Sequence, residues 1–348
     1  MKRRGSRPEQ AVPATRGPGA ARSAAGSRRA AARGPVSPWA AGGLLLFAGM
    51  AAFLALRGRG GAGPVYPIGG ASLCKRPPAF AAAQGFSAQA QLSTQDSRRL
   101  GLVITEGGAD DGVARVYQHP SWSLGGHLGP PVLDGSGNVY VIPVPYVHVL
   151  DNPAEKQNII YRVDGQTGKM RPLVDLPVVA PPSAANPYGL VGLTYDCDLQ
   201  SLYASSLSGS DETRTLGRLY QVDPASGKVR DMMEGIDAFG LSTFNGAKGK
   251  RLYFGLARRS AVVSLALNAD GGFADQAPRS EFSLAGLGVH GDEKARRITV
   301  GPDQAMVVRI MTFDFNLVSN SERLQTGLRY TYDGAIDRWS YADRFPID

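Results

Sequence analysis

Histidine and cysteine are scarce in this sequence, with four histidines and two cysteines among 348 residues. No two histidines have the three- or four-residue spacing of a helical zinc site, and neither cysteine belongs to a Cys-x-x-Cys pair. The sequence also lacks a GxSxG motif, a P-loop and a GxGxxG that follows a strand and opens a helix. Zinc enzymes, α/β-hydrolases and nucleotide-binding enzymes therefore have no support in the sequence.

Excess charge of one sign is confined to the N-terminal tail. Residues 1–38 contain nine Lys or Arg and one Glu, whereas the remaining 310 residues contain 29 basic and 29 acidic residues. The net charge of +8 therefore lies entirely in the tail, and the rest of the chain has no electrostatic basis for binding a phosphate backbone. We expect no nucleic-acid partner.

Long hydrophobic runs are absent except for one. Residues 39–56 contain 18 residues without a charge, which at about 1.5 Å per residue approaches the thickness of a bilayer's hydrocarbon core. Residues 1–38 lack an apolar period and are expected to be disordered. The cations precede the apolar run, and positively charged flanks of a membrane helix stay in the cytoplasm. This predicts a cytoplasmic tail and an extracytoplasmic domain, which would be periplasmic in a bacterium. We interpret residues 39–56 as a transmembrane signal-anchor; a signal peptide cleaved after Ala62 and a buried soluble helix are the alternatives.

Two segments follow this predicted transmembrane helix. Residues 57–78 are rich in Gly and Pro and are interpreted as a linker, and residues 79–348 as the folded domain. Cys74 in the linker and Cys197 in the domain lie on the side predicted to be oxidising, so they are candidates for a disulfide bond between linker and domain. A free Cys74 with a buried Cys197 is the alternative.

A pair of strand-like runs repeats four times in the folded domain. The first copy comprises residues 138–141 (NVYV) and 160–164 (IYRVD), and later copies follow at intervals of roughly 45 to 65 residues. Each second run ends in Asp or Asn, which favours a tight turn. The pattern predicts an all-β fold, a β-propeller of five or six antiparallel four-stranded blades. Residues 339–345 are the expected closing strand of the ring, because an unpaired edge would favour aggregation.

One of the repeats carries a resemblance to a known group of propellers. Residues 186–190 (NPYGL), 201–203 (SLY) and 217–228 (GRLYQVDPASGK) resemble a blade of the group that includes NHL repeats, the SMP-30 or gluconolactonase family and strictosidine-synthase-like proteins. The resemblance covers about residues 100–348. Its motifs build blades, so it implies the fold and says little about chemistry.

The same resemblance implies a metal site. SMP-30 proteins hold a divalent metal near the axis with an early Glu, two Asn and an Asp, and Glu106 and Asn186 are similar to two of these ligands, which makes Ca²⁺ or Zn²⁺ the implied cofactor. In this sequence, however, Pro-Tyr rather than Gly follows Asn186, and Ser205 and Ser206 replace the Asp. A hard cation needs about six oxygen ligands, so these departures weaken the predicted site.

Further candidates are polar and aromatic side chains near predicted strand ends, where a propeller's axial mouth is formed. They are His119, Trp122, His127, Tyr188 and His290. The alternative for each is an ordinary loop contact. The segment from His290 through Arg297 is interpreted as a solvated loop with local ion pairs.

Two function classes remain open on these grounds. We favour a membrane-tethered propeller that binds or scaffolds a protein, peptide or glycan partner, because the domain is nearly neutral and lacks catalytic spacing. The alternative is a metal-dependent lactonase or related hydrolase that uses the axial mouth, and it depends on the blade resemblance and Glu106.

Overall fold

The computed structural model describes residues 65–347, apart from residue 97 and residues 108–114, 146–152 and 317–324. The predicted tail (1–38), the predicted transmembrane helix (39–56) and the first part of the linker lie outside these described residues. Within the described residues, no helix is long and apolar enough to cross a membrane.

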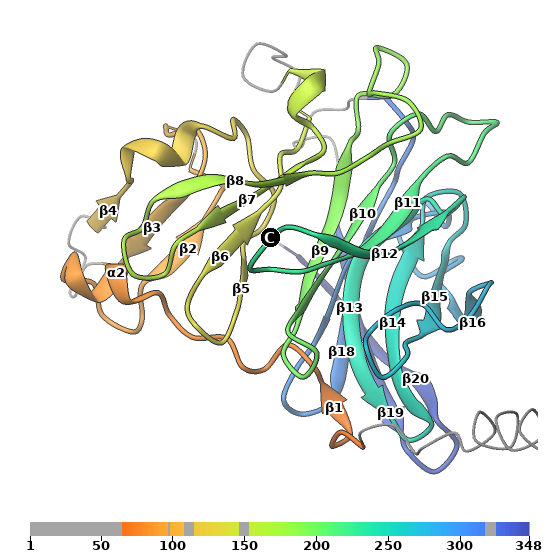
Figure 1. The fold of residues 1–348 in the computed structure, drawn as a ribbon. Coiled ribbons are helices and arrows are strands. Elements are labelled where there is room, and N and C mark those ends of the chain that lie inside the picture. The colour runs from red at the N-terminus through yellow and green to blue at the C-terminus, as the bar shows by residue number, and fades with distance from the viewer. Residues whose placement is uncertain (1–64, 97, 108–114, 146–152, 317–324, 348) are drawn as a thin grey trace, which may run out of the picture. The chain divides into compact units, whose positions relative to one another are not determined.

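Five antiparallel sheets follow one another along the chain, and each is one blade of a β-propeller (Figure 1). The predicted all-β propeller is confirmed, with five blades. Blade 1 consists of β2 (Gln91–Ser93), β3 (Val103–Glu106) and β4 (Arg115–Tyr117), and blade 2 of β5 (Val132–Leu133), β6 (Val139–Val141), β7 (Ile159–Val163) and β8 (Met170–Asp175). Blade 3 consists of β9 (Leu190–Asp196), β10 (Ser201–Ser206), β11 (Arg218–Val222) and β12 (Val229–Glu234), and blade 4 of β13 (Ala238–Gly246), β14 (Gly249–Leu256), β15 (Ala261–Ala266) and β16 (Arg279–Ser283). Blade 5 consists of β17 (Lys294–Val300), β18 (Ala305–Met311), β19 (Thr326–Asp333) and β20 (Arg338–Pro346).

Helices are short and lie between strands. They are α2 (Ala79–Ala83), η1 (Pro120–Ser123) and η2 (Ala154–Lys156). The first strands of neighbouring blades lie against one another, since β13 contacts both β9 and β17. The first strand of each of these blades is therefore the one nearest the propeller axis.

The repeated runs of the sequence are the second and third strands of blades 2 to 5. The turns after the third strands are built as their residues predict: the Oδ1 atom of Asp164 accepts the backbone N–H of Thr167 at 2.9 Å, and Oδ1 of Asp223 accepts that of Ser226 at 2.9 Å. Gly168 and Gly227 follow with positive φ angles of 71° and 75°. An Asx turn ended by a left-handed glycine thus links the third strand to the fourth in blades 2 and 3.

Apolar clusters join neighbouring blades. Blades 1 and 2 share Ile104 and Val139, blades 2 and 3 share Tyr140 and Leu202, and two further clusters join blade 3 to blade 4 and blade 4 to blade 5. Among the described residues, no apolar cluster of this kind joins blade 5 to blade 1. In the part of the chain that the structure describes, one of the five interfaces around the axis therefore lacks a hydrophobic core.

The N-terminal segment, residues 65–78, lies along the propeller although the sequence assigned it to a linker. Strand β1 (Gly69–Gly70) pairs with β13 of blade 4, and the backbone N–H of Cys197 donates to the carbonyl of Ala71. Cys74 and Cys197 form a disulfide bond with a Cα–Cα distance of 5.8 Å. Strand pairing with the propeller thus begins at Gly69, before the boundary near residue 78 expected from composition.

The expectation that residues 339–345 close the ring is wrong. These residues lie in β20, which pairs with β19 as the outer strand of blade 5, and no strand pairing among the described residues joins blade 5 to blade 1. The cause is local: the turn between Asp333 and Arg338 brings β20 back onto β19, and a short hairpin costs less loop-closure entropy than a return to the first blade.

Candidate functional site

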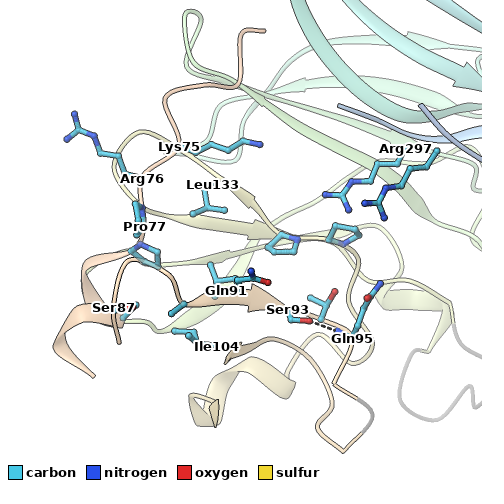
Figure 2. A pocket seen from close by; sticks show the side chains of 18 residues that line it. Lys75, Arg76, Pro77, Ser87, Gln91, Ser93, Gln95, Ile104, Leu133 and Arg297 are labelled. Atoms are coloured by element: carbon cyan, nitrogen blue, oxygen red, sulfur yellow. Dashed lines mark hydrogen bonds between the residues drawn. The ribbon is translucent and has the colours of Figure 1, made fainter. Parts of the chain in front are cut away.

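A cavity of about 620 Å³ lies between blades 1, 2 and 5 and the N-terminal segment. Its walls come from β2 and the residues around it, from the residues before β5, from β17 and β18, and from residues 75–78 (Figure 2). This is the region where blade 5 and blade 1 share no apolar cluster. The cavity therefore occupies the one interface between blades that lacks a hydrophobic core among the described residues.

Two arginines of blade 5 form the basic wall of the cavity. Arg297 on β17 and Arg309 on β18 are directly opposite each other in the antiparallel register, so their side chains leave the sheet on the same face. Both side chains are exposed and both line the cavity. Loss of hydration lowers the pKa of Arg297, and the positive charge of Arg309 lowers it further. The two charges are therefore close enough to repel each other.

Lys75 adds a third positive charge from the N-terminal segment. It directly follows the disulfide-bonded Cys74, and Figure 2 shows Lys75 and Arg297 extending toward each other from different walls. Partial loss of hydration lowers the pKa of the Lys75 ammonium group, and the charge of Arg297 lowers it further. Hydrogen bonds and ion pairs to the side chains of Lys75, Arg297 and Arg309 are absent among the described residues.

The wall of blade 1 is polar but uncharged. Gln91, Ser93 and Gln95 lie on it, and the hydroxyl of Ser93 accepts the backbone N–H of Gln95 at 3.1 Å (Figure 2). Ile104 and Leu133 supply apolar surface to the same cavity. Amide and hydroxyl groups opposite a basic wall, with some apolar surface between them, form the kind of mixed lining that orients a small polar molecule.

A second hollow, of about 220 Å³, is different in its electrostatics. There the carboxylate of Asp237 accepts the hydroxyl of Ser210 at 2.5 Å and the N–H of Gly217 at 3.0 Å, and it pairs with Arg258 at 3.2 Å. Burial raises the pKa of Asp237, while Ser210 and Arg258 oppose this shift. Asp237 and Arg258, two of the charged residues that line this smaller hollow, pair with each other, so we place the candidate site in the basic cavity.

The two residues proposed as metal ligands are both engaged in protein contacts. Asn186 is buried; its Nδ2 donates to the carbonyls of Leu207 and Ser210 at 2.8 and 2.7 Å, and its Oδ1 accepts the N–H of Tyr188 at 3.0 Å. Glu106 ends β3 and accepts the backbone N–H of Ser87 at 3.0 Å. Hydrogen bonds from Ser87 are the main cause of the lowered pKa of Glu106.

These contacts do not fit a metal of the SMP-30 type. The amide of Asn186 uses both of its donor hydrogens and one acceptor position to hold the loop before β9 to the loop after β10. Among the described residues, no three His, Cys, Asp or Glu side chains are grouped so that they could hold a metal ion. We therefore derive no chemistry from a bound metal.

None of the five aromatic and histidine candidates lines the basic cavity. Trp122 is fully buried between blades 1 and 2, and its Nε1 donates to the carbonyl of Gly168 at 2.8 Å. His119 caps η1, since its Nδ1 accepts the N–H of Ser121 at 3.1 Å. Tyr188 is buried and its hydroxyl donates to the carbonyl of Asn316 at 3.1 Å.

The two remaining histidines also lie outside that cavity. His127 is half-buried before blade 2, where its carbonyl accepts the N–H of Val144 at 2.9 Å. His290 is exposed, and its backbone N–H donates to Glu293 at 2.7 Å. The segment around His290 is a loop only as far as residue 293, because Lys294–Val300 is strand β17. Arg297 therefore lies in a strand and not in the expected loop, although its side chain is exposed.

The residues that line the cavity could not be identified from the sequence. Arg297 and Arg309 come together only through the register of β17 and β18, and Lys75 joins them only through the disulfide-bonded segment. The one usable signal is the alternation in Val307-Val308-Arg309-Ile310. It places Arg309 on the face opposite buried Val308 and Ile310.

Comparisons with known proteins concern the fold. No protein-family model matches the chain, and no curated protein matches it. A glucose dehydrogenase structure is 14% identical over 68% of this chain and 76% of its own, with a TM-score of 0.36. A candidate gluconolactonase is 14% identical over 79% of this chain and 99% of its own, with a TM-score of 0.37. The Dos1 propeller is 12% identical over 74% of this chain and 57% of its own, with a TM-score of 0.34.

These similarities agree with the blade-level resemblance found in the sequence, since the chain has five propeller blades and the similar structures include a candidate gluconolactonase and other propellers. At 11 to 16% identity they transfer no residue role to this chain. The propeller architecture of this chain is established by its own five sheets.

Proposed function

We propose that this chain is an extracytoplasmic binding module, tethered to the membrane by residues 39–56, whose propeller holds a small polar ligand or the polar end of a larger partner in the basic cavity. The observation that carries the proposal is the cavity of about 620 Å³ at the interface between blades that lacks an apolar cluster among the described residues. An ordinary blade interface would fill this space with packed side chains, because protein interiors leave few voids larger than a water molecule.

The lining supports binding rather than a purely structural hollow. Empty structural cavities are apolar, whereas this one is lined by four cationic residues together with amide and hydroxyl side chains: Lys75, Arg76, Arg297, Arg309, Gln91, Gln95 and Ser93. The partner classes that suit such a lining are the glycan and peptide ligands expected from the sequence. Their hydroxyl, amide and carboxylate groups can use these donors and acceptors.

Blocking the cavity tests this function. Gln91 is exposed to the cavity and its side chain makes no hydrogen bond to another described residue, so Gln91→Trp should fill the space without disturbing the fold. We expect members of a panel of mono- and disaccharides, sugar acids and short peptides at millimolar concentration to raise the melting temperature of the full-length protein in detergent. Saturation a hundredfold above Kd corresponds to about 2.7 kcal/mol.

The matched control is Gln166→Trp, which places the same side chain in an exposed turn of blade 2 away from the cavity. Ligands that raise the melting temperature of the native protein should raise that of Gln166→Trp equally and leave that of Gln91→Trp unchanged. The proposal fails if no panel member protects the native protein, or if Gln91→Trp is protected as well as the control.

The tether is tested separately through topology. A reporter that is active only outside the cytoplasm, fused after Asp348, should be active in the native chain because nine cations precede the apolar run. Leu45→Arg should abolish that activity, since a charge at the centre of a membrane helix costs about 2.5–3.5 kcal/mol on insertion scales. A native fusion that is inactive, with its domain in the cytoplasm, would show that the tether is wrong.

A further inference from the structure

We propose that Arg297, Arg309 and Lys75 form an oxyanion subsite, so that the ligand of the cavity carries a carboxylate or phosphate group on a polar, hydroxyl-bearing body. This inference rests on the proposed binding function and deepens it by naming the ligand class. Sugar acids and sugar phosphates share the required chemistry, and the experiment below separates the two.

The first argument is the unfavourable pairing of like charges. Arg297 and Arg309 are cross-strand partners on one sheet face, where like charges destabilise a sheet. No carboxylate among the described residues pairs with either of them. Repulsion between two cations that have no internal counter-charge is expected of an anion-binding site without its ligand, because the bound anion supplies the missing charge.

The second argument is a comparison with other arginines of the propeller, several of which pair with a carboxylate. The closest comparison is Arg329, which lies on the same face of blade 5 opposite Val307 and pairs with Asp343 at 3.2 Å. Other paired arginines are Arg218 with Glu234, Arg230 with Asp223, Arg251 with Asp275, Arg258 with Asp237 and Arg279 with Glu281. Among the described residues, Arg297 and Arg309 therefore lack the carboxylate partner that Arg329 has in the same sheet.

The third argument is geometric. Guanidinium groups present planar forks of N–H donors that match the two oxygens of a carboxylate or the oxygens of a phosphate. Two such forks on adjacent strands, with the Lys75 ammonium group on the facing wall, can approach one oxyanion from different sides (Figure 2). Inside a cavity these charges are less screened than on an open surface, so the attraction of an anion is stronger.

The blade 1 wall defines the rest of the ligand. Gln91 and Gln95 offer amide donors and acceptors, and Ser93 offers a hydroxyl, while no carboxylate of the described residues lines the cavity. A body that bears several hydroxyl groups can hydrogen-bond to this wall while its anionic group contacts the arginines. A purely apolar anion would exclude water from these amides without pairing them, which costs free energy.

Calorimetric titration of the full-length protein in detergent tests the inference with four probes: glucuronate, glucose 6-phosphate, glucose and inorganic phosphate. We expect glucuronate or glucose 6-phosphate to bind at least about tenfold more tightly than glucose, because a hydrogen bond to a charged group contributes more than a neutral one. Tighter binding of glucuronate assigns a carboxylate ligand, and tighter binding of glucose 6-phosphate assigns a phosphate ligand. Inorganic phosphate should bind more weakly than the preferred sugar anion because it cannot use the blade 1 wall.

The variants are Arg297→Met and Arg309→Met, with Arg329→Met as the matched control on the same sheet face. Each of the first two should weaken binding of the preferred anion about tenfold to a hundredfold and leave glucose binding unchanged, and the control should bind like the native protein. Without ligand, Arg297→Met and Arg309→Met should melt no lower than the native protein, because each removes a like-charge contact.

Three results would overturn the subsite. The first is glucose binding as tightly as both sugar anions, the second is anion affinity unchanged in Arg297→Met and Arg309→Met, and the third is that neither sugar anion binds. The binding function itself would still stand if other panel ligands protect the native protein and Gln91→Trp abolishes their effect. The two failures are thus distinguishable.

Discussion

Lys250→Met is expected to lower the free energy of unfolding by about 3–5 kcal/mol, because it leaves a buried carboxylate without its cation. The Lys250 ammonium group lies 2.7 Å from Asp196 Oδ2 and 2.7 Å from Asp198 Oδ2. The side chains of Lys250 and Asp196 are buried, with exposed fractions of 4% and 0%. Removing the cation therefore leaves Asp196 charged in a place that water cannot reach.

The stability lost in Lys250→Met should depend on pH, and the protonation of Asp196 sets the direction of this dependence. Burial raises the pKa of Asp196 and Lys250 lowers it, so the pKa rises further in Lys250→Met. Above that raised pKa the variant carries an unpaired buried charge, and below it the folded state binds a proton before the unfolded chain does. The stability difference between native protein and variant should therefore be largest near neutral pH and decrease as the pH falls through the raised pKa.

Urea denaturation monitored by tyrosine and tryptophan fluorescence measures this effect. The control is Asp196→Asn/Lys250→Met, which removes both charges while the introduced amide oxygen can still accept the backbone N–H groups of Asp198 and Leu199 that Asp196 Oδ1 accepts now. The double variant should recover much of the lost stability. A single variant as stable as the native protein across this pH range would show that the ion cluster does not hold the fold.

The ion cluster matters because it lies where the N-terminal segment meets the propeller. The ring of Tyr66 lies 4.6 Å from the Lys250 ammonium group, and β1 follows three residues later on β13. The same segment continues to Cys74 and Lys75. The cluster and the disulfide therefore hold the chain that forms one wall of the cavity at two places.

The fold was largely predictable because the second and third strands of each blade have local signals. Residues 160–164 and 219–223 are rich in β-branched and aromatic side chains and end in Asp before a Gly-containing turn, so strand and turn can be identified from neighbouring residues alone. The first strands gave no such signal. β13 is buried at eight of its nine positions and lacks the alternation that marks a half-exposed strand.

The cavity was not predictable because it depends on register. The pairing of β17 with β18 shifts between Ala295 and Arg297, and this bulge puts Arg297 on the cavity face while Arg296 packs on Phe239 with its guanidinium 4.9 Å from the ring centroid. One residue of difference in register would exchange these faces. A run of two adjacent arginines does not reveal which one faces a ligand.

Trp122 is the opposite case. The sequence indicated a place at the axial mouth, whereas the residue belongs to the hydrophobic core. A tryptophan between two histidines in a Gly- and Pro-containing stretch has the composition of a binding loop. Its indole nevertheless packs edge-on against Phe80 at 5.5 Å, and its N–H finds an acceptor at Gly168, 46 residues away. Partners this distant are supplied by the topology, which local sequence does not encode.

Cys74→Ser/Cys197→Ser is the second variant with a large expected effect, a loss of about 2–4 kcal/mol in unfolding free energy. The bond joins residues 123 positions apart, and in the chain-entropy model a loop of this size restricts the unfolded chain by about 4 to 5 kcal/mol before any loss from native strain. Removing both cysteines avoids a free thiol in the variant. Urea denaturation with and without dithiothreitol should show a large loss for the native protein in reductant and none for the variant.

The disulfide variant also separates the roles of Lys75 and the arginines. Lys75 is adjacent to Cys74, so loss of the bond should loosen the N-terminal wall, although the N–H of Arg76 still donates to the carbonyl of Asp134 at 3.3 Å. Arg297 and Arg309 stay in place because they lie on paired strands. Affinity for the preferred sugar anion should therefore fall less than in Arg297→Met under conditions where both proteins are folded. Complete loss of binding in the folded disulfide variant would mean that the N-terminal wall, rather than blade 5, carries most of the recognition.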